Sequence, residues 1–281
     1  MRVAFQGETG AFSEEAVTAY FGTVSGIPLS TFEAVFGAVV NGTVDRAVVP
    51  IENSLHGSVH SNYDLLDEYR VRIVGEITLR IRHNLLVLPG VRPNAIRRVS
   101  SHPQALGQCR RYLREMLPGA DIVPAYDTAG AAKMLADSQD RETAVIASGR
   151  AAAEYGLETI ATSIESNHQN YTRFIALADA EQAAGAEPPE TIPCKTAIVY
   201  SMKDNVPGAL FKSLAVFALR DIDLFKIESR PLVGSPGQYL FYLDMAGRVS
   251  DPAVDRALGH LGELTASLKV LGSFGIGRVV E

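Results

Sequence analysis

Hydrophobic residues in the first 178 positions fall into short apolar runs that alternate with stretches of helical spacing. Strands alternating with helices favour parallel, doubly wound α/β sheets. The region is long enough for one large domain or for two lobes around a cleft. The predicted strands are 2–6, 45–50, 71–81, 83–88, 96–100, 143–147 and 171–177, and the predicted helices are 12–20, 32–41, 58–68, 103–116 and 128–137.

The last part of the chain repeats a smaller pattern after a break. Residues 179–194 are rich in Ala, Glu and Pro and lack apolar periodicity, which predicts a surface linker. The order strand, helix, strand, strand, helix, strand then indicates a ferredoxin-like βαββαβ unit. Its predicted elements are 195–201, 208–220, 223–230, 238–247, 251–266 and 268–275.

Composition narrows the class of function. The 281 residues are 47% hydrophobic and 21% charged, which supports about two domains with real cores. A formal net charge of -6 gives no long-range attraction to nucleic acid or to an anionic membrane. We therefore expect a protein that acts on small molecules.

The cysteines predict a reducing compartment. Cys109 and Cys194 are far apart and have no metal-ligand spacing, so both are expected to be free thiols. The chain starts directly on an apparent strand, without an export segment, and no apolar run is long enough to span a membrane. A cytoplasmic location is expected.

No pattern in the sequence calls for a metal or a cofactor. His56, His60, His83 and His168 have no metal spacing and no obvious Ser or Cys partner, so they are expected to be surface or helix-capping residues. His168 is the exception to consider, because it approaches Thr172 in sequence.

Polar residues follow several of the predicted strands. Gln6–Glu15 places two glycines between a strand and a helix, where backbone amides bind anions, although the spacing also suits a simple tight turn. Residues 52–54, 101–104 and 127–128 repeat the order strand end, polar residues, helix. Helix capping explains each one alone. Three in one α/β layer favour a common cleft at the carboxyl ends of the strands.

Arg173 stands at the start of a predicted buried strand, in Asn170–Phe174. One interpretation is that its side chain extends to the surface. In a cleft, however, the planar guanidinium fits a substrate carboxylate.

These segments together resemble prephenate dehydratase. Each motif is weak alone, but their common order and spacing are specific. In the first region they are QGETGAFSE at 6–14, VVPIENS at 48–54, SHPQAL at 101–106, DTAGAA at 127–132 and TRF at 172–174. The last region resembles an ACT domain, through GALFKSL at 208–214 and KIESRP at 226–231.

The resemblance implies a catalytic domain at 1–178 with two lobes like those of periplasmic binding proteins. Lobe 1 would take about 1–78 and 161–178, and lobe 2 about 79–160. Residues 179–194 would be the linker and 195–281 the regulatory ACT domain.

The implied site contains Thr172 as the essential catalytic residue, with Arg173 and Glu52 beside it. Thr172 would donate a hydrogen bond to the leaving hydroxyl, Arg173 would hold a substrate carboxylate, and a protonated Glu52 is the competing acid. Substrate contacts are implied for Asn53, Ser54, Ser101, Gln104, Thr128 and Phe174. No cofactor is implied.

The ACT resemblance implies phenylalanine binding at a subunit interface, and therefore a homodimer or homotetramer. The implied effector contacts are Asn205, Gly208, Ala209, Leu210, Glu228, Ser229, Arg230 and Pro231.

The implied activity is the decarboxylating dehydration of prephenate to phenylpyruvate in phenylalanine biosynthesis, under feedback control by phenylalanine. Two alternatives remain open: an arogenate dehydratase that makes phenylalanine directly, and a non-catalytic amino-acid sensor. The sequence departs from the family pattern at His56, where relatives usually have a small residue, and in Asn167–Tyr171.

Overall fold

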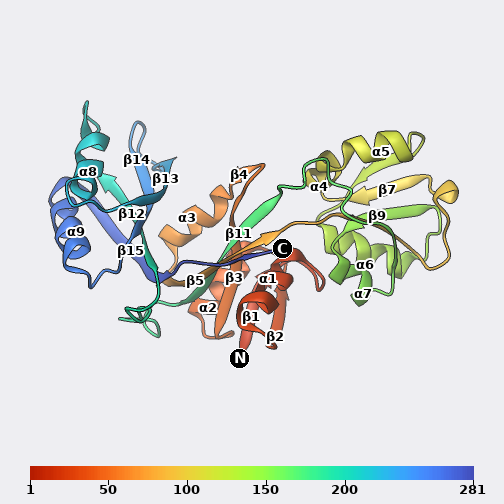
Figure 1. The fold of residues 1–281 in the computed structure, drawn as a ribbon, viewed down its shortest axis with the longest axis horizontal. Coiled ribbons are helices and arrows are strands. Elements are labelled where there is room, and N and C mark those ends of the chain that lie inside the picture. The colour runs from red at the N-terminus through yellow and green to blue at the C-terminus, as the bar shows by residue number, and fades with distance from the viewer.

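The computed structural model describes residues 1–281 as three sheets in a row, with the first sheet in the middle (Figure 1). This sheet has the order β16-β5-β11-β3-β1-β2, with β4 paired to β3. Its strands are β1 (Arg2–Gln6), β2 (Ser25–Leu29), β3 (Arg46–Asn53), β4 (Gly57–Ser58), β5 (Val71–Arg80), β11 (Tyr171–Asp179) and β16 (Val279–Val280), accompanied by helices α1 (Phe12–Phe21), α2 (Phe32–Val40) and α3 (His60–Glu68).

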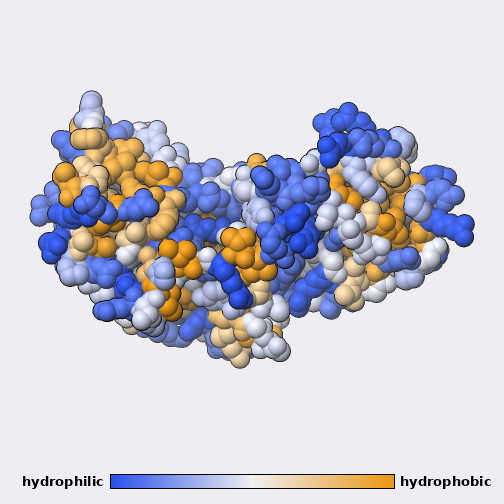
Figure 2. All heavy atoms as spheres, viewed as in Figure 1, coloured by the Kyte–Doolittle hydropathy of each residue, from blue (hydrophilic) through white to orange (hydrophobic).

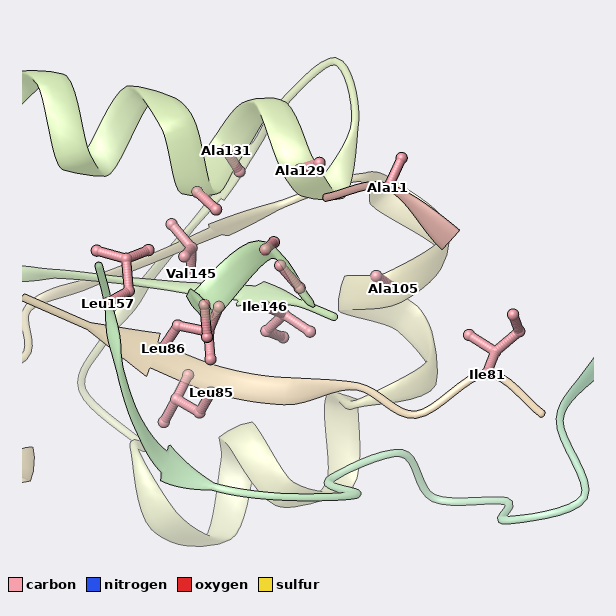
Figure 3. Close-up of a cluster of buried hydrophobic side chains, with 14 of the residues drawn as sticks. Ala11, Ile81, Leu85, Leu86, Ala105, Ala129, Ala131, Val145, Ile146 and Leu157 are labelled. Carbon is pink, nitrogen blue, oxygen red and sulfur yellow. The ribbon is translucent and has the colours of Figure 1, made fainter. Parts of the chain in front are cut away.

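The second sheet forms a separate lobe from the middle of the chain. Its order is β10-β6-β9-β7-β8. Leu86 of β6 and Val145 of β9 are buried in its core, with Ala129 and Ala131 of α6 above them (Figure 3). The elements are β6 (Asn84–Val87), β7 (Arg98–Ser101), β8 (Asp121–Pro124), β9 (Thr143–Ala147) and β10 (Glu158–Ala161), with η1 (Pro93–Ala95), α4 (Pro103–Gln108), α5 (Arg110–Met116), α6 (Thr128–Ser138) and α7 (Gly149–Glu154).

Both sheets are mixed, whereas the sequence predicted parallel ones. β1 pairs in parallel with β2 and β3, but β11 runs antiparallel to both β3 and β5. The chain leaves the first lobe after β5 and returns to it through β11, so these neighbouring strands run in opposite directions. The sequence also missed β2, β4, β8, β10, β16 and α7, which are short, and prolines lie in β2 and at the end of β8.

The third sheet confirms the predicted βαββαβ unit. Its order is β13-β14-β12-β15, entirely antiparallel. Ile198, Tyr200 and Met245 on one face pack against Phe217 and Leu261 of two helices. The elements are β12 (Cys194–Met202), α8 (Ala209–Ala218), β13 (Leu224–Pro231), β14 (Tyr239–Ala246), α9 (Pro252–Leu264) and β15 (Thr265–Gly275). We call this part the C-terminal unit.

The other face of the third sheet packs on the first lobe. Tyr242 and Phe274 share a buried core with Tyr63, Leu66 and Ile73. The Tyr63 and Tyr242 rings lie 4.9 Å apart, edge to face. The chain end then returns to the middle of the molecule, where β16 pairs with β5 (Figure 1). The C-terminal unit is therefore fixed to the first lobe by a shared core as well as by the linker.

No helix or strand interrupts the chain between Asp179 and Cys194, as predicted for the linker. None of the helices combines the length and the apolar character needed to cross a membrane.

Candidate active site

A cavity of about 510 Å³ lies between the first and second lobes and is lined by 24 residues. The first lobe contributes Asn53 from the end of β3 and Thr172 from the start of β11, and the second lobe contributes Gln104 and Thr128 from the starts of α4 and α6. Because the carboxyl end of β3 and several helix starts meet at this edge, polar groups gather where an open α/β sheet binds ligands. We call this cavity the cleft.

The start of α1 offers free backbone donors to the cleft. Its N-cap residue, Ala11, has no side chain to accept from the first turn, and the amides of Phe12 and Ser13 have no acceptor in the protein. Uncapped amides at a helix start favour an anion. No Lys or Arg side chain lines the cleft, so the helix starts are a source of positive electrostatic potential there.

Thr172 and Asn53 are cross-strand partners in the β11–β3 pair. The Asn53 Nδ2 atom donates to Thr172 Oγ1 at 3.0 Å. Because the hydroxyl oxygen accepts this bond, its own proton is free to point into the cleft. Thr172 is only 8% exposed, so this donor acts in a largely dry environment.

Backbone amides fix the orientation of Asn53. Its Oδ1 atom accepts from the backbone amides of Leu55 at 3.0 Å and His56 at 3.1 Å. Nδ2 must therefore be the atom that faces Thr172 and Asn170, whose Oδ1 accepts from it at 2.8 Å. The Asn170 Nδ2 atom in turn donates to Gln108 Oε1 at 3.0 Å.

This chain of amides crosses from the first lobe to the second and ends at a histidine. Gln108 Oε1 lies 2.5 Å from His83 Nε2. Because an amide oxygen only accepts, His83 must carry its proton on Nε2. Burial lowers the pKa of His83, although Gln108 and Glu165 act in the opposite direction, so its neutral form is favoured.

The structure brings five of the implied catalytic and substrate residues together in the cleft wall: Asn53, Gln104, Thr128, Thr172 and Phe174. Phe12 also lines the cleft and, like Phe174, contributes an apolar surface beside the four polar residues.

Arg173 and Glu52 do not lie in the cleft. The Arg173 guanidinium donates to Glu76 Oε2 and to Asp244 Oδ2, each at 2.6 Å. The Glu52 Oε2 atom lies 3.1 Å from Lys226 Nζ. Both side chains point to the C-terminal unit, which corrects their implied direct roles in catalysis.

Strand geometry explains this correction. Side chains alternate along β11, so Thr172 and Phe174 face the cleft and Arg173 faces away. In β3 the register shifts opposite Arg173 and Phe174, because Glu52 pairs with Arg173 and Pro50 with Phe174. The extra residue is a bulge, which turns Asn53 instead of Glu52 to the cleft.

The Ser54 and Ser101 side chains do not line the cleft and instead form hydrogen bonds to backbone carbonyls. The Ser54 hydroxyl donates to the carbonyl of Gln169 at 2.8 Å, and the Ser101 hydroxyl donates to that of Ile146 at 2.6 Å. Their implied substrate contacts are not present in this structure.

His83 was misjudged from the sequence, because it lines the cleft and is only 3% exposed, so it is not a surface residue. His56 is exposed, as expected, but it also lines the cleft. His168 lies 3.3 Å from Glu165 and does not line the cleft. His102 lines the cleft and also caps α4, accepting from the Gln104 amide at 3.2 Å.

The sequence contains a signal that could have placed Gln108 in the cleft wall. It follows Gln104 by four positions on a predicted helix, which places both on one face. No comparable signal marks His83, because only the return of the chain brings it to Gln108.

Asp127 is the one carboxylic acid in the cleft wall. Its Oδ1 atom caps α6 by accepting from the Gly130 amide, and its Oδ2 atom is buried without a partner. Burial raises the pKa of Asp127, more than the capping bond lowers it.

The implied effector residues divide into two groups. Asn205, Ala209 and Leu210 border a small hollow of about 30 Å³ beside the start of α8. Glu228 and Arg230 instead reach the first lobe: Glu228 Oε2 accepts from the Ser58 hydroxyl at 2.5 Å, and Arg230 pairs with Asp64 at 2.7 Å. Gly208 precedes α8, whereas Ser229 and Pro231 alternate with Glu228 and Arg230 and point to the other face of β13.

The architecture is thus a two-lobed α/β protein with a polar cleft between the lobes and a ferredoxin-like unit packed on the first lobe. Residues 3–182 match the prephenate dehydratase family. The chain is 45% identical to "Arogenate dehydratase 2" of Petunia hybrida, covering 98% of this chain and 71% of that protein. It is 44% identical to "Arogenate dehydratase/prephenate dehydratase 2, chloroplastic" of Arabidopsis thaliana, covering 98% and 73%.

A solved prephenate dehydratase from Arthrobacter aurescens, in complex with L-Phe, superposes with a TM-score of 0.90. It is 35% identical and covers 98% of this chain and 90% of that one. This chain belongs to the prephenate dehydratase family, and it is a dehydratase enzyme.

Proposed function

We propose that this chain converts prephenate to phenylpyruvate, water and carbon dioxide in phenylalanine biosynthesis. The observation that carries the proposal is the Thr172 hydroxyl, which is held by Asn53 and keeps its proton free for the cleft. The cleft offers this donor to a leaving hydroxyl group.

Substrate binding is assigned to the helix starts. Prephenate is a dianion, and the uncapped amides of Phe12 and Ser13 form a site for one carboxylate. These amides take the role in carboxylate binding that the resemblance implied for Arg173, because its guanidinium is already bound by two carboxylates outside the cleft. Gln104 and Thr128 at the other helix starts supply neutral donors.

The reaction needs help chiefly at the leaving oxygen. As the bond from the ring to its carboxylate breaks, the electron pair enters the ring and the ring carbon–oxygen bond breaks on the opposite side. The hydroxide leaves and takes up a proton to become water. An ordinary alcohol is a weak acid, so Thr172 stabilises the departing oxygen by hydrogen bonding. Asp127, with its raised pKa, replaces Glu52 as the competing proton donor.

The apolar part of the cleft suits the carboxylate that is lost. Phe12, Ile81 and Phe174 line the cleft together. Decarboxylation spreads the negative charge into the ring, so an environment with few donors favours the transition state over the bound carboxylate. We assign the ring carboxylate to this wall.

Arogenate is the second candidate substrate, and Asp127 is the observation that favours it. Arogenate has an ammonium group where prephenate has a keto group, and an ionised Asp127 would pair with that ammonium. The cleft contains no Lys or Arg that would repel it.

The test is an assay of the purified chain on both substrates. We expect phenylpyruvate, followed by its ultraviolet absorbance, to form from prephenate, with phenylalanine as an added inhibitor. Faster formation of phenylalanine from arogenate would assign the second substrate. A chain that binds phenylalanine but converts neither compound is a sensor, and the proposed activity is then wrong.

Phenylalanine control is assigned to the hollow beside α8. At about 30 Å³ the hollow holds roughly one water, so one chain cannot enclose a phenyl ring. Leu210, Phe211 and Leu219 are exposed nearby on α8 and just after it, by 38%, 76% and 79%. Figure 2 shows hydrophobic residues gathered on the visible face of the C-terminal unit. A second copy would complete the site and cover these residues, giving a homodimer or homotetramer.

Sedimentation of the chain with and without phenylalanine tests this assembly. A monomer that is nevertheless inhibited by phenylalanine would contradict it.

We also assign the protein to the cytoplasm, in keeping with its two free, buried cysteines.

A further inference from the structure

One pair of strands has the cleft on one face and the C-terminal unit on the other. Asn53 and Thr172 are cross-strand partners that line the cleft. The adjacent cross-strand pair is Glu52 and Arg173, and both reach residues of the C-terminal unit. One peptide bond in each strand therefore joins the second pair to the first.

Arg173 belongs to a buried cluster of four charges. It donates to Glu76 of β5 and Asp244 of β14 at 2.6 Å each, and Lys195 of β12 lies 2.7 Å from Glu76. The side chains of Arg173, Glu76, Asp244 and Lys195 are 16%, 6%, 12% and 9% exposed. Two cations face two anions, so the loss of any one leaves an unpaired buried charge.

The shifted pKa values agree with tight pairing in this cluster. Burial acts to raise the pKa of Glu76, but Arg173, the Gly277 amide and Lys195 together hold it below its ordinary value. Burial acts to lower the pKa of Arg173, yet Asp244 and Glu76 raise it. Both groups therefore stay charged although they are withdrawn from water.

Glu52 has a parallel contact with the edge strand of the C-terminal unit. Lys226 Nζ of β13 lies 3.1 Å from Glu52 and donates to the Ser58 hydroxyl at 3.1 Å. Ser58 lines the cleft and also donates to Glu228 of β13. The hairpin of β3 and β4, which forms one wall of the cleft, is thus held from behind by β13.

Strand β14, whose Asp244 pairs with Arg173, also reaches the hollow assigned to phenylalanine. Tyr239 and Phe241 of β14 border that hollow, and Asp244 of the same strand binds Arg173. A β-strand transmits displacement along its length because its ladder hydrogen bonds resist slippage. A shift of the C-terminal sheet on the first lobe therefore moves Asp244 together with the effector hollow.

We propose that Glu52 and Arg173 are positioning residues through which the C-terminal unit holds Asn53 and Thr172 in place. They do not touch substrate. Phenylalanine lowers turnover by changing the Asp244–Arg173 and Lys226–Glu52 contacts. The kinetic part of this inference rests on the dehydratase function proposed above.

The first experiment uses Asp244→Asn in the full chain. Arg173 loses one of its two carboxylates, so we expect kcat to fall by about 2- to 30-fold, the range of coupling through packed networks, with little change in KM. Inhibition by phenylalanine should weaken. Lys226→Gln should also lower kcat and weaken inhibition by phenylalanine. This variant replaces Asp244→Asn in the test if Asp244→Asn does not fold.

Lys269→Gln is the matched control. Lys269 also ties the C-terminal unit to the first lobe, donating to the carbonyls of Leu66, Asp67 and Tyr69, but at the end of α3 and away from Thr172. It should keep its kcat and its inhibition. Equal effects from Lys269→Gln and Asp244→Asn would mean that docking in general is responsible, and the proposal would fail.

A double-mutant cycle of Arg173→Gln and Asp244→Asn tests the direct contact. We expect the loss in kcat for the double variant to be smaller than the product of the single losses, because the same ion pair is removed twice. Independent effects would overturn the proposal.

A readout without substrate separates this inference from the proposed function. The methyl NMR signal of Thr172 should move in Asp244→Asn and stay in place in Lys269→Gln. If the unmutated chain converts neither prephenate nor arogenate, the function fails, but the methyl signal still decides the inference. An unmoved Thr172 signal in a folded Asp244→Asn variant refutes the coupling.

Discussion

At the residue scale, the Thr172 side chain in the cleft is oriented by hydrogen bonds to neighbouring groups. Thr172 has a hydroxyl like any other, but Asn53 occupies its acceptor position, and two backbone amides hold Asn53. Because the hydroxyl oxygen accepts from Asn53, its proton remains available to the cleft. Such preorganised donors stabilise developing charge without reorganising during the reaction.

Thr172→Ala is expected to lower kcat by about 10²–10⁴-fold, the usual effect of losing a positioned donor. Thr172→Ser keeps the hydroxyl and is the matched control, with a much smaller loss. Binding of phenylalanine, measured by calorimetry, should stay normal in both. Near-normal kcat in a folded Thr172→Ala variant would remove Thr172 from the mechanism.

His83 predicts a pH dependence of stability. Burial holds its pKa below the ordinary 6.5, so in the window below 6.5 the unfolded chain takes up a proton that the folded chain refuses. The free energy of unfolding should therefore fall as pH drops through this window. His83→Gln, whose amide can still donate to Gln108, should reduce the slope in denaturant titrations. The control is His260→Gln on the exposed side of α9. An unchanged slope in His83→Gln would contradict the buried, neutral state.

At the element scale, two local irregularities decide which residues meet in the cleft. The bulge in β3 turns Asn53 to the cleft. The loop before α1 is held by α7 of the second lobe, where the Ser148 hydroxyl donates to the Gly10 carbonyl at 2.6 Å. The second contact aims the uncapped start of α1 at the cleft and draws the lobes together, with Ala11 lying near Ala129 of α6 (Figure 3).

Gly10→Ala should destabilise the protein by about 1–3 kcal/mol and weaken substrate binding. Gly10 has a φ of +88°, and a Cβ atom there would lie 2.7 Å from the Cα of Ala151. Gly22→Ala is the control, because Gly22 has a φ of +73° but nothing within 4 Å of the added carbon. Thermal unfolding compares the two variants. Equal losses would show that backbone strain alone is responsible and that the contact with α7 contributes nothing.

At the scale of the whole molecule, the C-terminal unit is packed firmly against the lobe that contributes Asn53 and Thr172 to the cleft. Its sheet covers Tyr63, Leu66 and Ile73 of the first lobe, its charges bind Arg173, and β16 extends the first sheet. Regulation by a unit docked in this way needs only a change in how two packed faces meet.

A chain that ends at residue 190 is expected to retain the cleft but to unfold at lower temperature, turn over more slowly and lose inhibition by phenylalanine. Removal of the C-terminal unit exposes an apolar face and leaves Arg173 with only Glu76. Thermal unfolding and binding of a hydrophobic dye measure the first effect. A truncated chain as stable as the full chain would mean that the shared core contributes little. Unchanged inhibition would place phenylalanine in the catalytic cleft.

Local patterns in the sequence were enough to predict most of the longer elements and several of the segments that line the cleft. Apolar runs, helical spacing and turn residues are local properties, so the βαββαβ unit and helices α1, α2 and α6 follow from them. Asn53, Gln104 and Thr128 lie where a predicted strand ends or a predicted helix begins, and such side chains face one edge of the sheet. Thr172 was instead implied by the TRF motif of the family resemblance.

The contacts of Glu52, Arg173, His83 and Glu228 could not be predicted from the sequence. A bulge, a returning strand and a docked sheet set the direction in which these side chains point, and each depends on partners far away in the chain. A charge beside a catalytic residue looks the same in the sequence whether it faces a substrate or another charge. Strand alternation, shifted by one extra residue in β3, is the physical reason that Glu52 and Arg173 face the C-terminal unit.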